Sequence, residues 1–125
     1  MSSNEINNLK KRIDSKTSRA IKDTALYIQA TAKLIIKNSP RGGRVYGSHK
    51  ASAPGEPPAT DTGNLINSIQ TIEIGKDHMR VHVGAEYGHM LEYGTRKMAP
   101  RPYFRPAVKL GRKFFNRRLN ATGKN

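Results

Sequence analysis

Apolar residues recur every three or four positions from residue 5 to residue 37, which is the spacing of one face of an α-helix. The members of this face are Ile6, Leu9, Ile13, Ala20, Thr24, Tyr27, Ile28, Thr31, Leu34 and Ile35. Asn4 or Ser3 can cap the start of the helix. Pro40 ends it, because a residue that precedes proline leaves the helical region. The pattern therefore predicts one uninterrupted helix over residues 5–37.

Such a helix would be about 50 Å long, which exceeds the width of a domain of this size. Residues 1–20 contain few apolar and many charged side chains, so we expect them to project from the domain or to lie against a neighbour. Residues 25–36 are richer in apolar side chains and should pack on a sheet.

The period changes from helical to alternating in the middle of the chain. Ile72 and Ile74 alternate with polar neighbours, and the apolar residues of 79–83 do the same after the turn sequence at 75–78. This pattern predicts an antiparallel hairpin. Because two strands alone are marginally stable, we expect a third strand, from Val45–Tyr46 or from residues 96–104.

The sequence also predicts three shorter helices. The first is expected over 61–70, with Asp61 or Thr62 as its cap. The second covers 86–93 and ends at Gly94. Prolines should keep 98–105 extended, and the last helix should then run from Pro106 to about Leu119, leaving 120–125 as a frayed tail.

Residues 39–61 are dominated by glycine, proline and serine, and they predict an extended loop with one short edge strand at 44–46. A loop of this length in a small domain is usually functional or disordered. We expect it to reach a neighbouring subunit or ring. The whole pattern predicts a single α+β domain over 1–125, in which a long N-terminal helix and a C-terminal helix pack on a small antiparallel sheet.

The chain carries 23 basic and nine acidic residues, for a net charge of +14. Ten basic residues and no acidic residue follow Glu92. This imbalance allows two interpretations: a solvated surface whose charges repel one another, or, as we favour, a surface for an anionic partner, either nucleic acid or an acidic protein surface. The candidates for such contacts are Lys10, Lys11, Arg12, Arg112, Lys113, Arg117 and Arg118.

Four aromatic residues lie among the basic residues of 87–108, and they allow two interpretations. They can stack on bases, or they can pack in the core and between subunits, which their alternation with apolar neighbours favours. The four residues are Tyr87, Tyr93, Tyr103 and Phe104.

Candidate chemistry is sparse. The chain has no cysteine, its carboxylates are not spaced as a general acid and base, and it lacks a GxSxG nucleophile motif. His78 and His82 would lie about 13 Å apart on a strand, and the pair His89 and Glu92 lacks a third ligand. We therefore expect neither an enzyme nor a cofactor or metal site. The longest apolar run is three residues, so we expect no membrane span, and the N-terminus predicts an intracellular origin.

Two stretches together resemble the neck or tail-component proteins of tailed bacteriophages, of the tail-completion type. The first is His49 followed by ASAPGEPPATDTGNLINSI at 51–69. The second contains LEYGT at 91–95 and RPYF at 101–104, followed by Pro106 and Ala107. The resemblance covers roughly residues 40–110, with matching order and spacing, and the set is more specific than any one piece.

The resemblance implies a virion protein that assembles in the host bacterial cytoplasm into a cyclic ring of identical subunits at the head–tail junction. The ring would lie between the head-side connector or portal and the tail, with genome DNA passing along its axis. The candidate interface residues are Arg44, Tyr46, His49, Pro54, Glu56, Pro57, Arg96, Lys97, Arg101 and Arg105. The alternative is a basic DNA-binding module, since the family pattern does not account for the strong positive charge.

Overall fold

A computed structural model describes residues 2–39, 45–46, 49–50, 63–85, 87–96 and 99–122, with the backbone alone at 45–46, 49–50 and 121–122. Its longest element is helix α1, Ser3–Lys37. The helix begins earlier than expected, because Ser2 and not Asn4 or Ser3 is the cap. The Ser2 hydroxyl accepts from the Glu5 backbone N–H at 3.2 Å, and the Glu5 carboxylate accepts from the Ser2 backbone N–H at 3.4 Å.

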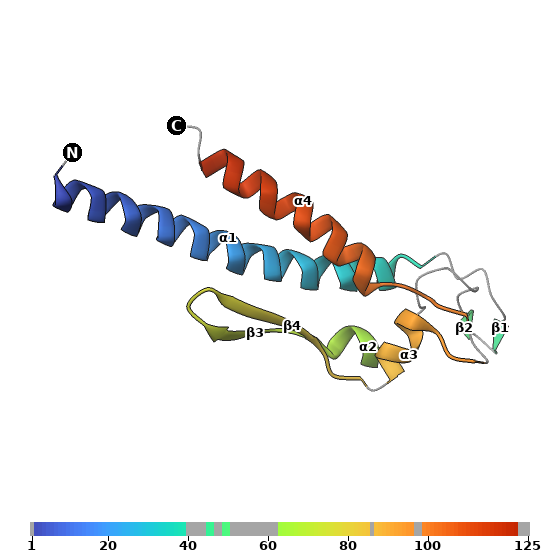
Figure 1. Cartoon of the computed structure of the whole chain (residues 1–125). Helices are drawn as coiled ribbons and strands as arrows, with labels where there is room; N and C mark the ends of the chain where they lie inside the picture. Colours follow the sequence, from blue (N-terminus) through green and yellow to red (C-terminus); the bar gives the residue numbers. More distant parts are fainter. Residues whose placement is uncertain are drawn as a thin grey trace.

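Helix α1 is the central element of the fold, and both the other long helix and the hairpin pack against it (Figure 1). Helix α4, Phe104–Thr122, packs along one side of it, and the hairpin of β3, Ile69–Gly75, and β4, His78–Val83, packs along another. The structure confirms the α+β class, with the C-terminal helix packed chiefly on α1. Side chains from Ser2 to Lys16 are all exposed, and in Figure 1 the N-terminal part of α1 extends past both partners.

The buried core lies at the other end of the molecule. Its members come from the last two turns of α1, from α2, from the start of β3, from the residue before α4 and from the first turn of α4. They are Ala32, Ile36, Leu65, Ile69, Tyr103 and Ala107. Helix α2, Asn64–Asn67, is shorter than the predicted 61–70 because the chain enters β3 at Ile69. The proposed caps Asp61 and Thr62 lie outside the described residues.

The hairpin prediction is confirmed, but the expected third strand is not found in the described part of the chain. β3 and β4 pair from Ile69 opposite Val83 to Gly75 opposite His78, with an irregularity between Glu73 and Gly75. Val45–Tyr46 forms β1, which pairs with β2, His49–Lys50, in a separate two-stranded sheet. α1 supports the hairpin instead: the Thr71 hydroxyl donates to the Gln29 side-chain carbonyl, and Lys22 pairs with Glu73 at 3.3 Å.

Helix α3, Tyr87–Tyr93, ends as predicted at Gly94, whose φ of 76° is the left-handed conformation that glycine favours. Helix α4 starts two residues earlier than expected, at Phe104, and Pro106 still lies in its first turn. It continues to Thr122, so residues 120–122 are helical and not frayed, while 123–125 lie outside the described residues. Among the described helices, none is long and apolar enough to cross a bilayer.

Candidate interaction surfaces

The segment after α3 is held by a buried carboxylate, Glu92, which is only 5% exposed. Its two oxygens accept the backbone N–H groups of Tyr103, Phe104 and Arg105 at 3.1, 2.7 and 2.8 Å. These are N–H groups that the first turn of a helix cannot satisfy internally, and the negative charge also suits the positive end of the helix dipole. Glu92 therefore fixes where α4 begins. It is committed to this role and not to a metal site with His89, which packs beside Tyr93.

Tyr103 also holds the segment that leads into α4. Its side chain is 1% exposed, and its hydroxyl donates to the Gly88 carbonyl at 2.9 Å. Burial raises the pKa of the Tyr103 hydroxyl to about 12, and the negative charge of Glu92 adds to the rise. A side chain at Gly88 would lie 2.8 Å from this hydroxyl, so α3 can approach only because the position is glycine. Tyr103 is thus a core residue, and base stacking by its ring is contradicted by its burial.

The other aromatics of this stretch differ in exposure. Tyr87 and Tyr93 are exposed, at 42% and 55%, and Phe104 is half-buried. The guanidinium of Arg105 lies over the Tyr93 ring, 5.7 Å from its centroid. Tyr93 and Arg105 therefore form a surface pair of an aromatic ring and a cation.

Among the predicted interface residues, Arg96 and Arg105 are exposed and Arg101 is half-buried. The Arg101 backbone N–H donates to the Leu91 carbonyl at 2.6 Å, while its side-chain Nε is shielded and has no hydrogen-bond partner among the described residues. The backbones of Tyr46 and His49 are paired in the register of β1 and β2. The remaining predicted interface residues lie outside the described part of the chain: Arg44, Pro54, Glu56, Pro57 and Lys97.

Helices α1 and α4 run antiparallel. The Tyr27 and Phe114 rings stack with centroids 4.4 Å apart, and Arg118 pairs with Asp23. Arg118, predicted to contact an anionic partner, is therefore already paired within the chain. The structure leaves Arg112, Lys113 and Arg117 exposed.

The predicted basic residues do not form one patch. Lys10, Lys11 and Arg12 are exposed on the projecting part of α1. Lys11 lies about 18 Å along the helix axis from Asp23, the residue level with Arg118. The projecting cluster and the α4 cluster are thus two separate cationic surfaces.

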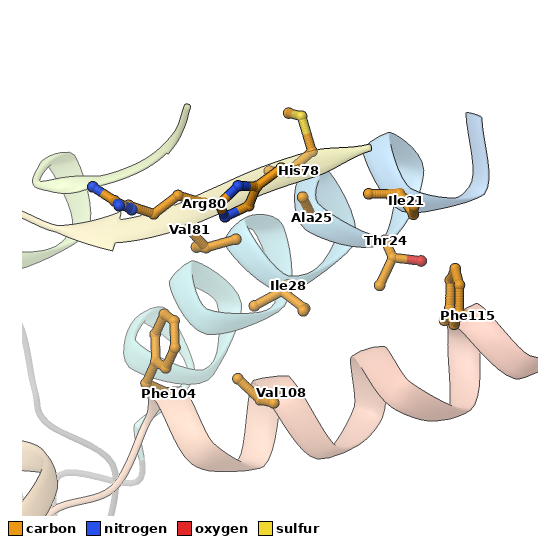
Figure 2. A pocket seen from close by; sticks show the side chains of 11 residues that line it. Ile21, Thr24, Ala25, Ile28, His78, Arg80, Val81, Phe104, Val108 and Phe115 are labelled. Atoms are coloured by element: carbon orange, nitrogen blue, oxygen red, sulfur yellow. The ribbon is translucent and has the colours of Figure 1, made fainter. Parts of the chain in front are cut away.

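An apolar groove of about 450 Å³ lies between β4 and α4, over the middle of α1. Figure 2 shows Ile28 and Val81 pointing toward Val108 and Phe104 across it. Thr24 also lines the groove, and its hydroxyl is buried without a hydrogen-bond partner among the described residues. The lining suits an apolar partner better than a polar small molecule.

Apolar side chains are also exposed outside the groove. On α1, Ile6, Leu9 and Ile13 form a stripe at positions i, i+3 and i+7, with Ile13 54% exposed. On β3, Ile72 and Ile74 are 39% and 45% exposed. Ile72 pairs with Arg80, on the opposite face from Thr71, which bonds to α1. These positions are surfaces that the described fold leaves uncovered.

A metal site requires a cluster of ligating side chains. In the described part of the chain, no three His, Asp or Glu side chains come together as metal ligands.

No family model matches the chain, and neither the search of curated proteins nor that of solved structures finds a match.

Proposed function

We propose that this chain is a structural virion protein of a tailed bacteriophage, a subunit of a closed ring at the head–tail junction. The ring would join the head-side connector or portal to the tail, or complete the tail, and let DNA pass. The observation that carries the proposal is the exposure of large apolar side chains on several elements of one small chain. The resemblance of 51–69 and 91–107 to neck and tail-completion proteins supports the same conclusion.

Ring closure requires a heterologous contact, in which two different surfaces of identical subunits meet. The chain offers two such surfaces. The stripe of Ile6, Leu9 and Ile13 lies on the exposed N-terminal part of α1, and the groove beside Val108 lies over the middle of that helix. An amphipathic helix placed in an apolar groove is a common mode of recognition. The stripe of one subunit would then occupy the groove of the next.

Arg101 supports a second contact in the same ring. A guanidinium is suited to bidentate pairing with a carboxylate, and Arg101 is half-buried, so part of its side chain is open to a neighbouring subunit. A carboxylate of that subunit would pair with the open part of the side chain. Arg101→Glu should therefore block oligomerisation, and a normal ring in this variant would refute the Arg101 contact.

The deciding experiment is a mass measurement of the purified chain across salt, with and without DNA and with connector or tail protein added. A ring subunit should give a defined oligomer that tolerates salt, either alone or on meeting its connector or tail. Ile6→Ser with Ile13→Ser should abolish that oligomer. Asn7→Ser with Asn8→Ser, on the same exposed turns, is the matched control and should leave it intact. A chain that stays monomeric under every condition would contradict the proposal.

The alternative function is a basic DNA-binding module that acts as a monomer. It predicts DNA binding with a steep salt dependence and an unchanged mass in both serine variants. The same measurements therefore separate the two functions.

A further inference from the structure

Basic and amide side chains dominate the solvent-facing side of α4, and exposed Leu110 lies at its edge, beside Arg117. With 3.6 residues per turn, Arg105, Lys109, Arg112, Lys113 and Asn116 share the side opposite the residues that contact α1. All of them are exposed, as is the adjacent Arg117. We name these six residues the basic ridge.

The opposite side of α4 packs against α1. Gly111 lies against Ile28, Phe114 stacks on Tyr27, and Arg118 pairs with Asp23. Apart from the contact of Arg105 with the Tyr93 ring, the ridge is therefore a separate surface that the packing of α4 on α1 does not use.

The cations of the ridge are not neutralised within the described part of the chain. Arg118 and Lys22 pair with carboxylates, but no ridge side chain pairs with a carboxylate of the described residues. Arg105 and Lys109, like Lys109 and Lys113, are four residues apart, and like charges at that spacing destabilise a helix. α4 itself contains no acidic residue. A partner with regularly placed negative charge would relieve this repulsion.

We propose that the basic ridge binds the phosphate backbone of duplex DNA. From Arg105 to Arg117 the ridge spans about 18 Å, and the two strands of a duplex together present a phosphate about every 1.7 Å along the axis. About half of these roughly ten phosphates lie on the side of the duplex that faces the ridge, so each of the five cations has one within reach, with Asn116 as an additional hydrogen-bond donor. An acidic protein surface has no such regular charge spacing, which is why the ridge fits DNA better.

The surface beside the ridge extends the contact. An open groove of about 830 Å³ is lined by Arg105, Lys109 and Arg112 together with exposed Tyr93. The rest of its lining is apolar, so the groove places three cations beside a surface on which the sugars of the DNA backbone can pack. The inference deepens the proposed function, in which DNA passes along the ring, but the ridge belongs to one chain and does not require the ring.

The test is fluorescence anisotropy of the full chain with a labelled 20-base-pair duplex of arbitrary sequence, at 50 and 200 mM salt. Five phosphate contacts predict that wild-type affinity falls about 500-fold between these concentrations. Lys109→Ala, Arg112→Ala and Lys113→Ala combined should bind more weakly at 50 mM, and its affinity should fall only about tenfold. The matched control is Lys10→Ala, Lys11→Ala and Arg12→Ala combined, which removes the same charge and should keep the wild-type salt dependence. Circular dichroism of both variants should match that of the wild type, since all six residues are exposed.

Equal losses in the ridge variant and the control would overturn the proposal, because binding would then follow net charge alone. Polyglutamate that binds more tightly than DNA and is lost in the ridge variant would also overturn it, and would assign the ridge to an acidic protein. Oligomer mass is measured on the same samples. A chain that forms the ring but does not bind DNA would refute only this inference. A monomer that binds DNA through the ridge would refute only the proposed ring.

Discussion

Gly111 of α4 lies directly against Ile28 of α1: a Cβ at Gly111 would be 2.4 Å from Ile28 Cγ1 and 2.7 Å from its Cδ1. The glycine therefore sets how closely the two long helices approach. The contact lies next to the Tyr27–Phe114 ring stack, so a change in the helix spacing would also affect that stack.

Gly111→Ala should destabilise the fold, although alanine is the better helix former by about 1 kcal/mol. Forcing a methyl group into this contact costs about 1–3 kcal/mol, so we expect a net loss of about 1 kcal/mol in urea unfolding. Ile28→Ala in the same chain should remove most of the clash and give a favourable coupling energy in a double-mutant cycle. Asn116→Ala, on the solvent side of α4, is the control and should be neutral or stabilising. Independent, additive effects of Gly111 and Ile28 would show that the helices do not meet at this point.

Glu92→Ala should be among the most destabilising single substitutions in this chain. It leaves the backbone N–H groups of Tyr103, Phe104 and Arg105 without their acceptor. We expect a loss of about 2–4 kcal/mol, since each unsatisfied donor costs about 1–3 kcal/mol and solvent can reach some of them. Glu92→Gln keeps one acceptor oxygen and should cost less. Hydrogen exchange at those three amides should accelerate in both variants, and unchanged protection there would contradict the capping role.

The ends of α4 show why its start could not be placed from sequence. The residues that lead into α4, Arg101 to Arg105, include none of the usual capping types, so Pro106 was the best available signal. The missing cap was itself a clue that an acceptor comes from elsewhere. Identifying Glu92 as that acceptor requires the fold, because its partners lie eleven to thirteen residues away.

Long periodic segments were predictable because their apolar spacing repeats many times, as in α1 and the hairpin. The outward face of β3 was not. The alternation of apolar and polar residues along each strand was predicted. In the observed register, however, Ile72 lies opposite Arg80 and not opposite Val81. Register depends on how two strands are aligned, and a shift of one residue exchanges the two faces. The groove between β4 and α4 depends on the same tertiary placement.

Tyr103 should make the fold sensitive to alkaline pH. The pKa of its hydroxyl is raised to about 12 in the folded chain, against about 10 when unfolded. Below pH 10 the Tyr103 hydroxyl keeps its proton in both the folded and the unfolded chain, so its contribution to the free energy of unfolding is fully present. Between pH 10 and 12 the unfolded state loses its proton first, so stability falls, by about 1.4 kcal/mol at pH 11.

Tyr103→Phe tests this effect. At pH 8 it should be about 1 kcal/mol less stable than the wild type, because the hydrogen bond to the Gly88 carbonyl is lost. As pH rises to 11 this difference should vanish or reverse in urea unfolding, since phenylalanine does not titrate and the other basic groups are common to both chains. A constant difference from pH 8 to pH 11 would rule out the proposed shift.

Ile72 and Val81 should respond oppositely to a hydroxyl. Val81 packs against the core cluster, so Val81→Thr places a polar group there and should cost about 1–2 kcal/mol. Ile72 lies on the outer face of β3, 39% exposed, and Ile72→Thr keeps β-branching, so the free energy of unfolding should change by less than about 0.5 kcal/mol. Urea unfolding of the monomer, below the concentration at which it associates, separates the two. The reverse order of costs would mean that β3 and β4 pair one residue out of the described register. An Ile72→Thr chain that folds normally but no longer assembles would instead place the outer face of the hairpin at a subunit contact.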